Sequence, residues 1–179
     1  MTPFFTDRLT IRELDENDAT FLLELLNEPA FIANIADRGV RTVDDALAYL
    51  RDGPQAMIAK HGFGLWRVSL NRGDKPIGIC GILKRDSLPD PDLGYALLAR
   101  QCGHGYAIEA AAATLDIARS TFGCDRVLAI TSLENAASIR VLEKLDFRFE
   151  EIRQLPGVSK QSRVFVSDCK RSKTAVHTP

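Results

Sequence analysis

The chain has 179 residues, of which 45% are hydrophobic and 26% are charged. These values are typical of globular proteins and exclude a wholly disordered or membrane-embedded chain. The formal net charge of −1 creates no strong field that would attract nucleic acid or an anionic membrane. The length fits one domain. We place that domain at residues 1–169 and expect the basic, polar segment 170–179 to be disordered.

The four cysteines, at positions 80, 102, 124 and 169, are far apart and form no Cys-x-x-Cys pair. We therefore expect no metal site, and simple thiols in a reducing compartment. The first residues lack the basic and apolar regions of a signal peptide. No apolar run approaches the roughly eighteen residues that a membrane span needs. The sequence thus predicts a cytoplasmic protein.

The N-terminal part predicts a strand followed by helices. Residues 9–14 alternate between apolar and polar side chains, as a short strand does. Asp15 can cap the next helix, whose apolar face lies within residues 21–26 and which should end near Pro29. Residues 31–40 predict a loop or a short turn of helix.

Further elements follow in the same order. Thr42 should cap a helix that Gly53-Pro54 breaks before a second helical piece. Residues 66–70 and 76–83 flank the turn 71–74 and predict an antiparallel hairpin.

The last third predicts a strand, a helix and two more strands. Residues 127–131 are apolar without alternation, which indicates a strand covered on both faces and paired in parallel. Asn135 should open a helix that continues to about Leu145. Two final strands are expected near 147–153 and 162–168.

The stretch Gly94 to Phe122 predicts a strand, a turn with two glycines, and a helix. The first turn of a helix exposes N–H groups and a partial positive charge, so it can hold an anion such as a phosphate. Gly103 and Gly105 would let the anion approach the backbone. Arg100 and His104 would be optional charged partners at its mouth.

Three phosphate-binding motifs compete for this stretch. A dinucleotide fold needs a third glycine where the chain has Ile108, and a P-loop needs Gly-Lys-Ser/Thr, which is absent. The remaining pattern is Arg100-x-x-Gly103-x-Gly105. It resembles the acetyl-CoA-binding signature, Gln/Arg-x-x-Gly-x-Gly/Ala, of the GCN5-related N-acetyltransferases (GNAT). A helix entry whose glycines merely suit a turn is the alternative.

A second segment, Glu134 to Phe147, is similar to the Glu-Asn-x-x-Ser-x-x-x-x-x-Lys-x-Gly-Phe segment of the RimJ/RimL-like branch of that family. Residues 9–12 and 92–95 also fit this branch. The resemblance covers about residues 7–169. It implies an α/β (α+β) fold with a mixed, mostly antiparallel central sheet of about seven strands, a splayed parallel pair and about four helices.

The resemblance also implies that acetyl-CoA is the acetyl-donating cosubstrate. Its pantetheine arm would lie where the strand at Leu97 and Leu98 separates from residues 127–131, and an N–H group of one of these leucines would bind the oxyanion. Asn135 would hydrogen-bond the arm, although helix capping explains this residue equally well. The pyrophosphate would lie on the backbone of Gly103, His104, Gly105, Tyr106 and Ala107.

Many family members have a tyrosine acid in the last helix, where this chain has Leu142. We name Ser138, four residues earlier on the same helical face, as the substitute acid. A local bond from its hydroxyl to the backbone is the alternative. Asp92 lies where relatives often have glutamate and is our candidate base, acting through water. Asp90 and Glu13 are reserves, and a solvated surface role is the alternative for all three carboxylates.

The resemblance therefore predicts an N-acetyltransferase that moves an acetyl group from acetyl-CoA to a primary amine by direct attack in a ternary complex. The acceptor would be a protein N-terminal α-amine or a small-molecule amine. At pH 7 about a tenth of an amine of pKa near 8 is neutral, against a few per ten thousand for lysine, so the α-amine is the easier acceptor. A non-catalytic acyl-CoA-binding or sensing protein of the same fold is the alternative, and a nucleotide-binding regulator is a third reading. Homodimers are common in the family, and the sequence does not show whether this chain forms one.

Two positions depart from the family pattern. Asp146 replaces the usual glycine after the last helix, where a left-handed φ is often required. Cys102 stands where relatives often have an aromatic residue, which leaves the shape of the cofactor mouth open.

Overall fold

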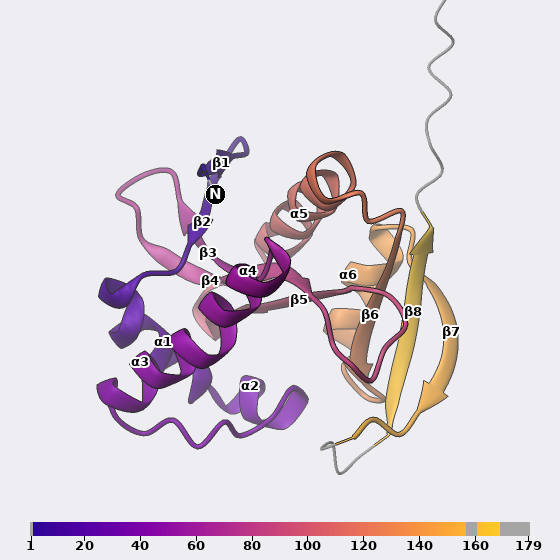
Figure 1. Cartoon of the computed structure of the whole chain (residues 1–179), viewed down its shortest axis with the longest axis horizontal. Helices are drawn as coiled ribbons and strands as arrows, with labels where there is room; N and C mark the ends of the chain where they lie inside the picture. The colour runs from indigo at the N-terminus through magenta and orange to yellow at the C-terminus, as the bar shows by residue number, and fades with distance from the viewer. Residues whose placement is uncertain (1, 157–160, 169–179) are drawn as a thin grey trace, which may run out of the picture.

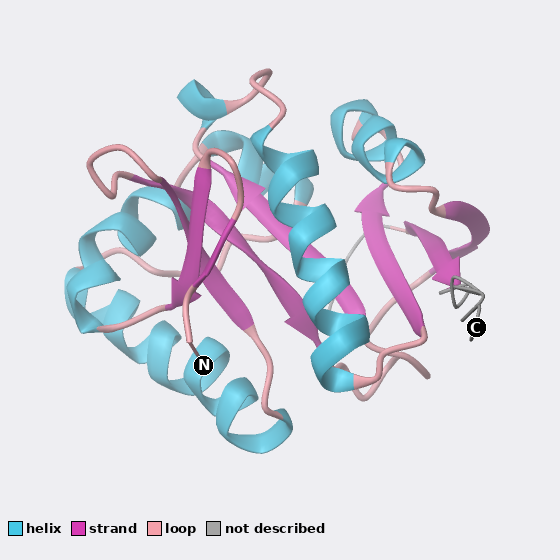
Figure 2. Cartoon of the chain, turned by 90° about the horizontal axis from the view of Figure 1, so that it is seen from above, coloured by secondary structure: helices cyan, strands magenta, loops and turns pink. Residues whose placement is uncertain are grey.

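The computed structural model describes residues 2–156 and 161–168. Within them, eight strands form one sheet in the order β1-β2-β3-β4-β5-β6-β8-β7, and helices cover both of its faces (Figure 1, Figure 2). The strands are β1 (Phe4–Phe5), β2 (Leu9–Glu13), β3 (Leu65–Leu70), β4 (Pro76–Leu83), β5 (Asp92–Leu97), β6 (Arg126–Ser132), β7 (Arg148–Arg153) and β8 (Ser162–Asp168).

The strand directions confirm the predicted fold class. In the described part of the chain, every neighbouring pair of strands is antiparallel except β5 and β6, which run parallel. The helices are α1 (Ala19–Leu26), α2 (Pro29–Asn34), α3 (Val43–Leu50), α4 (Ala56–His61), α5 (Tyr106–Phe122) and α6 (Ala136–Lys144), with three short segments, η1 (Glu16–Asp18), η2 (Arg51–Gln55) and η3 (Ala99–Gln101).

The observed elements differ from the sequence prediction in two places. The two-residue strand β1 was not predicted, because so short a strand shows no alternation. Gly53-Pro54 was expected to break the helix, but both residues lie in η2, a π-helical segment that joins α3 to α4 without a loop. The helix α1 ends at Leu26, close to Pro29 as predicted, and Pro29 itself occupies the first position of the short helix α2, where its missing N–H costs nothing.

Two hydrophobic clusters place the core on the two faces of the sheet. Leu115 and Ala118 of α5 pack with Trp66 and Cys80 against one face. The side chains of α1 and α3 pack with Ile79 against the other face. Among the described residues, no helix combines the length and the apolar character needed to cross a membrane.

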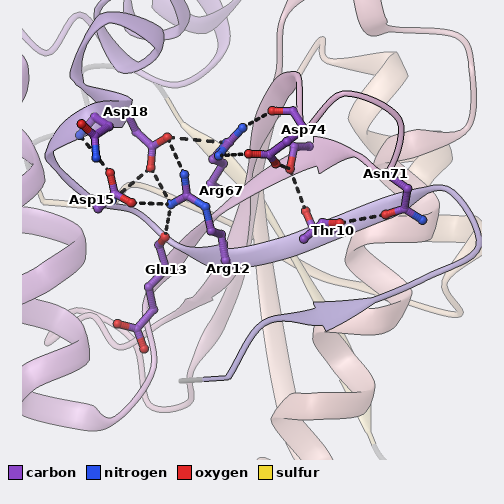
Figure 3. Close-up of polar contacts among 10 residues, drawn as sticks. Thr10, Arg12, Glu13, Asp15, Asp18, Arg67, Asn71 and Asp74 are labelled. Atoms are coloured by element: carbon purple, nitrogen blue, oxygen red, sulfur yellow. Dashed lines mark hydrogen bonds and ion pairs between the residues drawn. The ribbon is translucent and has the colours of Figure 1, made fainter.

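An ionic network whose centre, Asp18 and Arg67, is buried joins β2, η1 and β3 (Figure 3). Both carboxylate oxygens of Asp18 accept hydrogen bonds from Arg12, at 2.8 and 3.0 Å, and Arg67 Nε lies 3.5 Å from Asp18. Arg67 also bonds Asp74 in the turn between β3 and β4, at 3.0 Å. The network therefore fixes the hairpin against the first helices.

The helix ends follow the local sequence rules. Thr42 caps α3 in a reciprocal capping box with Asp45. Asp146, which replaces the glycine usual in the GNAT pattern, has a φ of +60° just after α6. Aspartate is one of the few residues with a side chain that adopts this left-handed conformation at modest cost, so the turn is retained. The predicted tail, 170–179, lies outside the described residues.

Candidate active site

The parallel strands β5 and β6 pair over only a short distance and then separate. Their register contains two pairs, Asp92 with Leu128 and Leu93 with Ala129. Beyond these pairs the strands enclose a cavity of about 550 Å³, which α2, α6 and the loop into α5 complete. Of the predicted site residues, the cavity is lined by Asp92, Leu97, Gly103, Gly105, Tyr106, Ala107, Asn135 and Ser138.

The free edge of β5 faces this cavity. The N–H group of Leu98 donates to the carbonyl of Ile77 at 2.9 Å, and the Leu98 side chain is fully buried in the core. Backbone groups of successive strand residues point to opposite sides. The N–H group of Leu97 therefore points away from β4, toward the gap left by β6. Of the two leucines, only Leu97 is placed to offer a donor to the cavity.

The N-terminus of α5 is the second wall. Gly105 is the N-cap, with a φ of +80° and no side-chain cap, and Gly103 has a φ of +83°. A left-handed φ favours glycine at both positions. The first N–H groups of the helix have no intrahelical partner. Because no side chain caps them, these N–H groups can donate hydrogen bonds to an anion, and the helix dipole would stabilise its negative charge.

The charged residues at this loop differ from those predicted. Arg100 lies outside the cavity lining and forms an ion pair with Glu24 of α1. His104 is exposed and stacks on Tyr106, with ring centroids 5.6 Å apart. Neither side chain lines the cavity, because η3 turns Arg100 toward α1 and the loop turns His104 outward.

Arg8, which the sequence analysis did not identify, approaches the same loop. Its Nη1 donates to the carbonyl of His104 at 3.0 Å, and its guanidinium group lies 4.7 Å from the Tyr106 ring centroid. Its Nε donates to Glu109 in the first turn of α5 at 2.6 Å. Arg8 therefore offsets the negative charge of Glu109, which would otherwise weaken anion binding at this helix end.

The start of α6 brings two polar side chains to the cavity, where they meet a third from β5. Asn135 Oδ1 accepts the N–H of Ser138 at 3.0 Å, so Asn135 caps the helix as the alternative interpretation required. The Ser138 hydroxyl lies 2.8 Å from the hydroxyl of Tyr95 on β5. Burial raises the pKa of Tyr95 to about 12, so its hydroxyl remains protonated at neutral pH.

The carboxylate of Asp92 is almost fully buried at the narrow end of the cavity. Its two oxygens lie 2.9 and 3.1 Å from Arg85 Nε. Burial raises its pKa, and the charge and hydrogen bond of Arg85 oppose that rise. Of the two reserve carboxylates, Asp90 pairs with Arg126 at 2.9 Å, and neither Asp90 nor Glu13 lines the cavity.

Comparison with known proteins identifies the family. The model of the acetyltransferase (GNAT) domain matches residues 8–148. The chain belongs to the GNAT acetyltransferase family. It is 28% identical over 153 residues to the uncharacterized protein YkkB of Bacillus subtilis, covering 84% of this chain and 87% of that protein.

Solved GNAT structures show the same fold. An acetyltransferase from Agrobacterium tumefaciens matches with a TM-score of 0.79 at 23% identity, covering 93% of this chain and 94% of that one. RimJ of Mycobacterium smegmatis, solved in complex with CoA-disulfide, matches with a TM-score of 0.74 at 19% identity, covering 94% and 90%. The RimJ/RimL proteins are thus distant structural neighbours of this GNAT chain.

Three residues of the site were missed by the sequence analysis: Arg8, Tyr95 and Arg85. Tyr95 lies within a motif quoted for the family, and its alternation with Ala96 on β5 was a usable signal that the two side chains lie on opposite faces of the sheet. Arg8 and Arg85 gave no local signal, because their partners lie on other elements. Cys102 lines the cavity, and its Sγ lies 3.7 Å from the carbonyl of Leu98.

Proposed function

We propose that this GNAT protein transfers the acetyl group of acetyl-CoA to a primary amine. The observation that carries the proposal is one continuous cavity that joins the free edge of β5 to the uncapped N-terminus of α5. A peptide-like arm and a diphosphate are the two parts of one ligand that such a cavity fits. The CoA-disulfide complex of RimJ from Mycobacterium smegmatis supports the choice of ligand.

The proposed roles in binding follow from the exposed backbone. The first N–H groups of α5, at Tyr106 and Ala107, would hold the diphosphate. The unpaired edge of β5 near Leu97 would bond the amides of the pantetheine arm as an added strand does. Gly103 has no atom within 4 Å of the position that a Cβ would take, so the loop leaves room for the phosphates.

The proposed roles in the chemistry use three groups. Bound acetyl-CoA supplies an electrophilic carbonyl and a thiol leaving group whose pKa is near 8.5. The Leu97 N–H would donate to the oxyanion. The Ser138 hydroxyl would donate a hydrogen bond to the departing sulfur. Asp92 would accept the proton of the incoming ammonium through water, a role that its raised pKa favours. Positioning of the two substrates can supply about 7–11 kcal/mol of the barrier reduction.

Calorimetry and thiol release test the proposal together. We expect the purified protein to take up CoA and to release thiol from acetyl-CoA when an amine is present. Peptides with a free N-terminus should react faster than peptides with a blocked N-terminus and an internal lysine, because more of the α-amine is neutral. Uptake of CoA without thiol release for any amine would indicate the acyl-CoA-binding alternative. Absence of CoA uptake would refute both, and stabilisation by ATP or NAD alone would indicate the nucleotide-binding reading.

A further inference from the structure

The charges around the cavity are unbalanced. Among the described residues that line it, Asp92 is the one carboxylate, whereas Arg85, Arg140 and Lys144 are basic. The Asp92 carboxylate is already engaged by Arg85. The cavity therefore has no uncompensated negative charge with which to hold a second ammonium group.

The position of Arg85 separates it from the proposed phosphate site. Its partner Asp92 begins β5, whereas the loop into α5 follows the other end of that strand. At about 3.3 Å per residue, the length of β5 puts roughly 15 Å between them. Arg85 is thus too far from the proposed diphosphate site to bind the diphosphate of the cofactor.

The guanidinium group of Arg85 keeps part of its bonding capacity. Only its Nε bonds Asp92, and its two terminal nitrogens have no partner among residues 2–156 and 161–168. Residues 1, 157–160 and 169–179, which lie outside this description, include no acidic residue. Two parallel N–H donors on a guanidinium group match the two oxygens of a carboxylate.

A second arginine, Arg38, follows in the chain three residues after Ile35, which lines the cavity. Arg38 is exposed and forms no ion pair within the described residues. Phe31 of α2 and Ile35, the C-cap of that helix, give the cavity an apolar wall.

We propose that the acceptor is a primary amine that carries a carboxylate close to the amine, and that the terminal nitrogens of Arg85 hold this carboxylate, with Arg38 adding to the positive field. This inference rests on the proposed acetyl transfer and adds the substrate class. A free amino acid and a peptide with an acidic first residue share this chemistry. Polycationic amines are disfavoured, because the cavity is already positive.

Matched acceptor pairs test the inference by thiol release. Leucine is compared with leucinamide, and the peptide Glu-Ala-Ala-Ala-amide with Gln-Ala-Ala-Ala-amide. We expect kcat/KM to be at least tenfold higher for the carboxylate member of one pair. The pair that shows this difference tells whether the acceptor is a free amino acid or a peptide with an acidic first residue. Intrinsic reactivity works against this result for leucine, because its carboxylate makes the amine harder to deprotonate. Equal or faster reaction of the uncharged member in both pairs would overturn the inference.

Variants test whether Arg85 is responsible. Arg85→Lys keeps a positive partner for Asp92 but loses the bidentate guanidinium donor. The preference, which is the ratio of kcat/KM between the carboxylate and uncharged members of a pair, should therefore fall at least tenfold. Arg38→Gln removes an exposed side chain and should lower the preference severalfold without affecting folding. Arg72→Gln, on the exposed turn between β3 and β4, is the matched control and should leave it unchanged.

The outcomes distinguish this inference from the proposed function. Wild-type turnover of amides and polyamines, with no preference for carboxylates, would refute the acceptor class and leave acetyl transfer intact. Unchanged preference in both Arg85→Lys and Arg38→Gln would refute the role of these arginines. No CoA uptake in the wild type would refute the proposed function itself.

Discussion

At the scale of single residues, the contact between Tyr95 and Ser138 limits how the leaving thiolate of the proposed reaction would be assisted. With a pKa of about 12, Tyr95 cannot easily give its proton to a thiolate whose thiol has a pKa near 8.5, because that transfer would cost about 5 kcal/mol. Tyr95 can instead donate a hydrogen bond to Ser138 Oγ. The serine hydroxyl is then free to donate a hydrogen bond to the departing sulfur, with no proton transferred. In the proposed mechanism, Tyr95 is thus a positioning residue for Ser138.

We expect Ser138→Ala to lower kcat about tenfold or more, through the loss of one donor to the developing charge. Tyr95→Phe should lower kcat by a smaller factor, and it should have no further effect in the Ser138→Ala background. Thiol release at saturating acetyl-CoA measures all three variants. A Tyr95→Phe effect that persists without Ser138 would show that Tyr95 does not act through this serine.

At the scale of elements, the loop into α5 depends on two glycines for its conformation and its access. Both have positive φ, and a Cβ at Gly103 would contact no other atom. An alanine there would cost the folded protein only the strain of the left-handed conformation, about 1–2 kcal/mol. Any weakening of anion binding by the alanine methyl group would be a separate effect, added to this loss of stability.

Gly73 provides a matched control for this loop. Gly73 has a φ of +76° and open space around its Cβ position, as Gly103 does, but it lies in the turn between β3 and β4. We expect Gly103→Ala and Gly73→Ala to lower the Tm by similar amounts. Only Gly103→Ala should weaken CoA binding, by at least tenfold in calorimetry. Equal CoA affinity in the two variants would place the diphosphate elsewhere.

At the scale of the whole molecule, the start of the chain is connected to the proposed cofactor site. Arg8 and Thr6 precede β2, and both bond Glu109 in α5, with Thr6 Oγ1 at 2.5 Å. Burial alone would raise the pKa of Glu109, but the hydrogen bonds from Thr6 and Arg8 outweigh it and lower that pKa. Folding is therefore favoured by the ionised form of Glu109.

The sign of the pH dependence follows from this lowered pKa. Stability gained from Glu109 is complete above its ordinary pKa of about 4.5 and is lost as the pH falls through the lower value in the folded state. Glu109→Gln should therefore cost about 1–2 kcal/mol of unfolding free energy at pH 7. This difference should disappear in strong acid. Urea unfolding at pH 7 and below pH 4 measures it, with exposed Glu16→Gln as the control; a pH-independent loss would contradict the linkage.

The elements of this GNAT domain were largely readable from the sequence. Periodicity, capping residues and the pair of glycines gave the hairpin, α5, α6 and the turn before α5, because those signals act within a few residues. The exceptions are β1, which has only two residues, and η2, where a π-helical segment accommodates Pro54 inside a helix.

The sequence by itself determined the fold class, the family resemblance and the glycine turn before α5, since each depends on local pattern. The tertiary structure alone decided that Arg8 rather than Arg100 approaches the loop, that Tyr95 meets Ser138, and that Arg85 holds Asp92. Tyr95 and Ser138 are 43 positions apart, and Arg8 and Glu109 are 101 apart. The partner of a side chain across such separations is set by how the strands and helices pack, and the packing is a property of the whole chain.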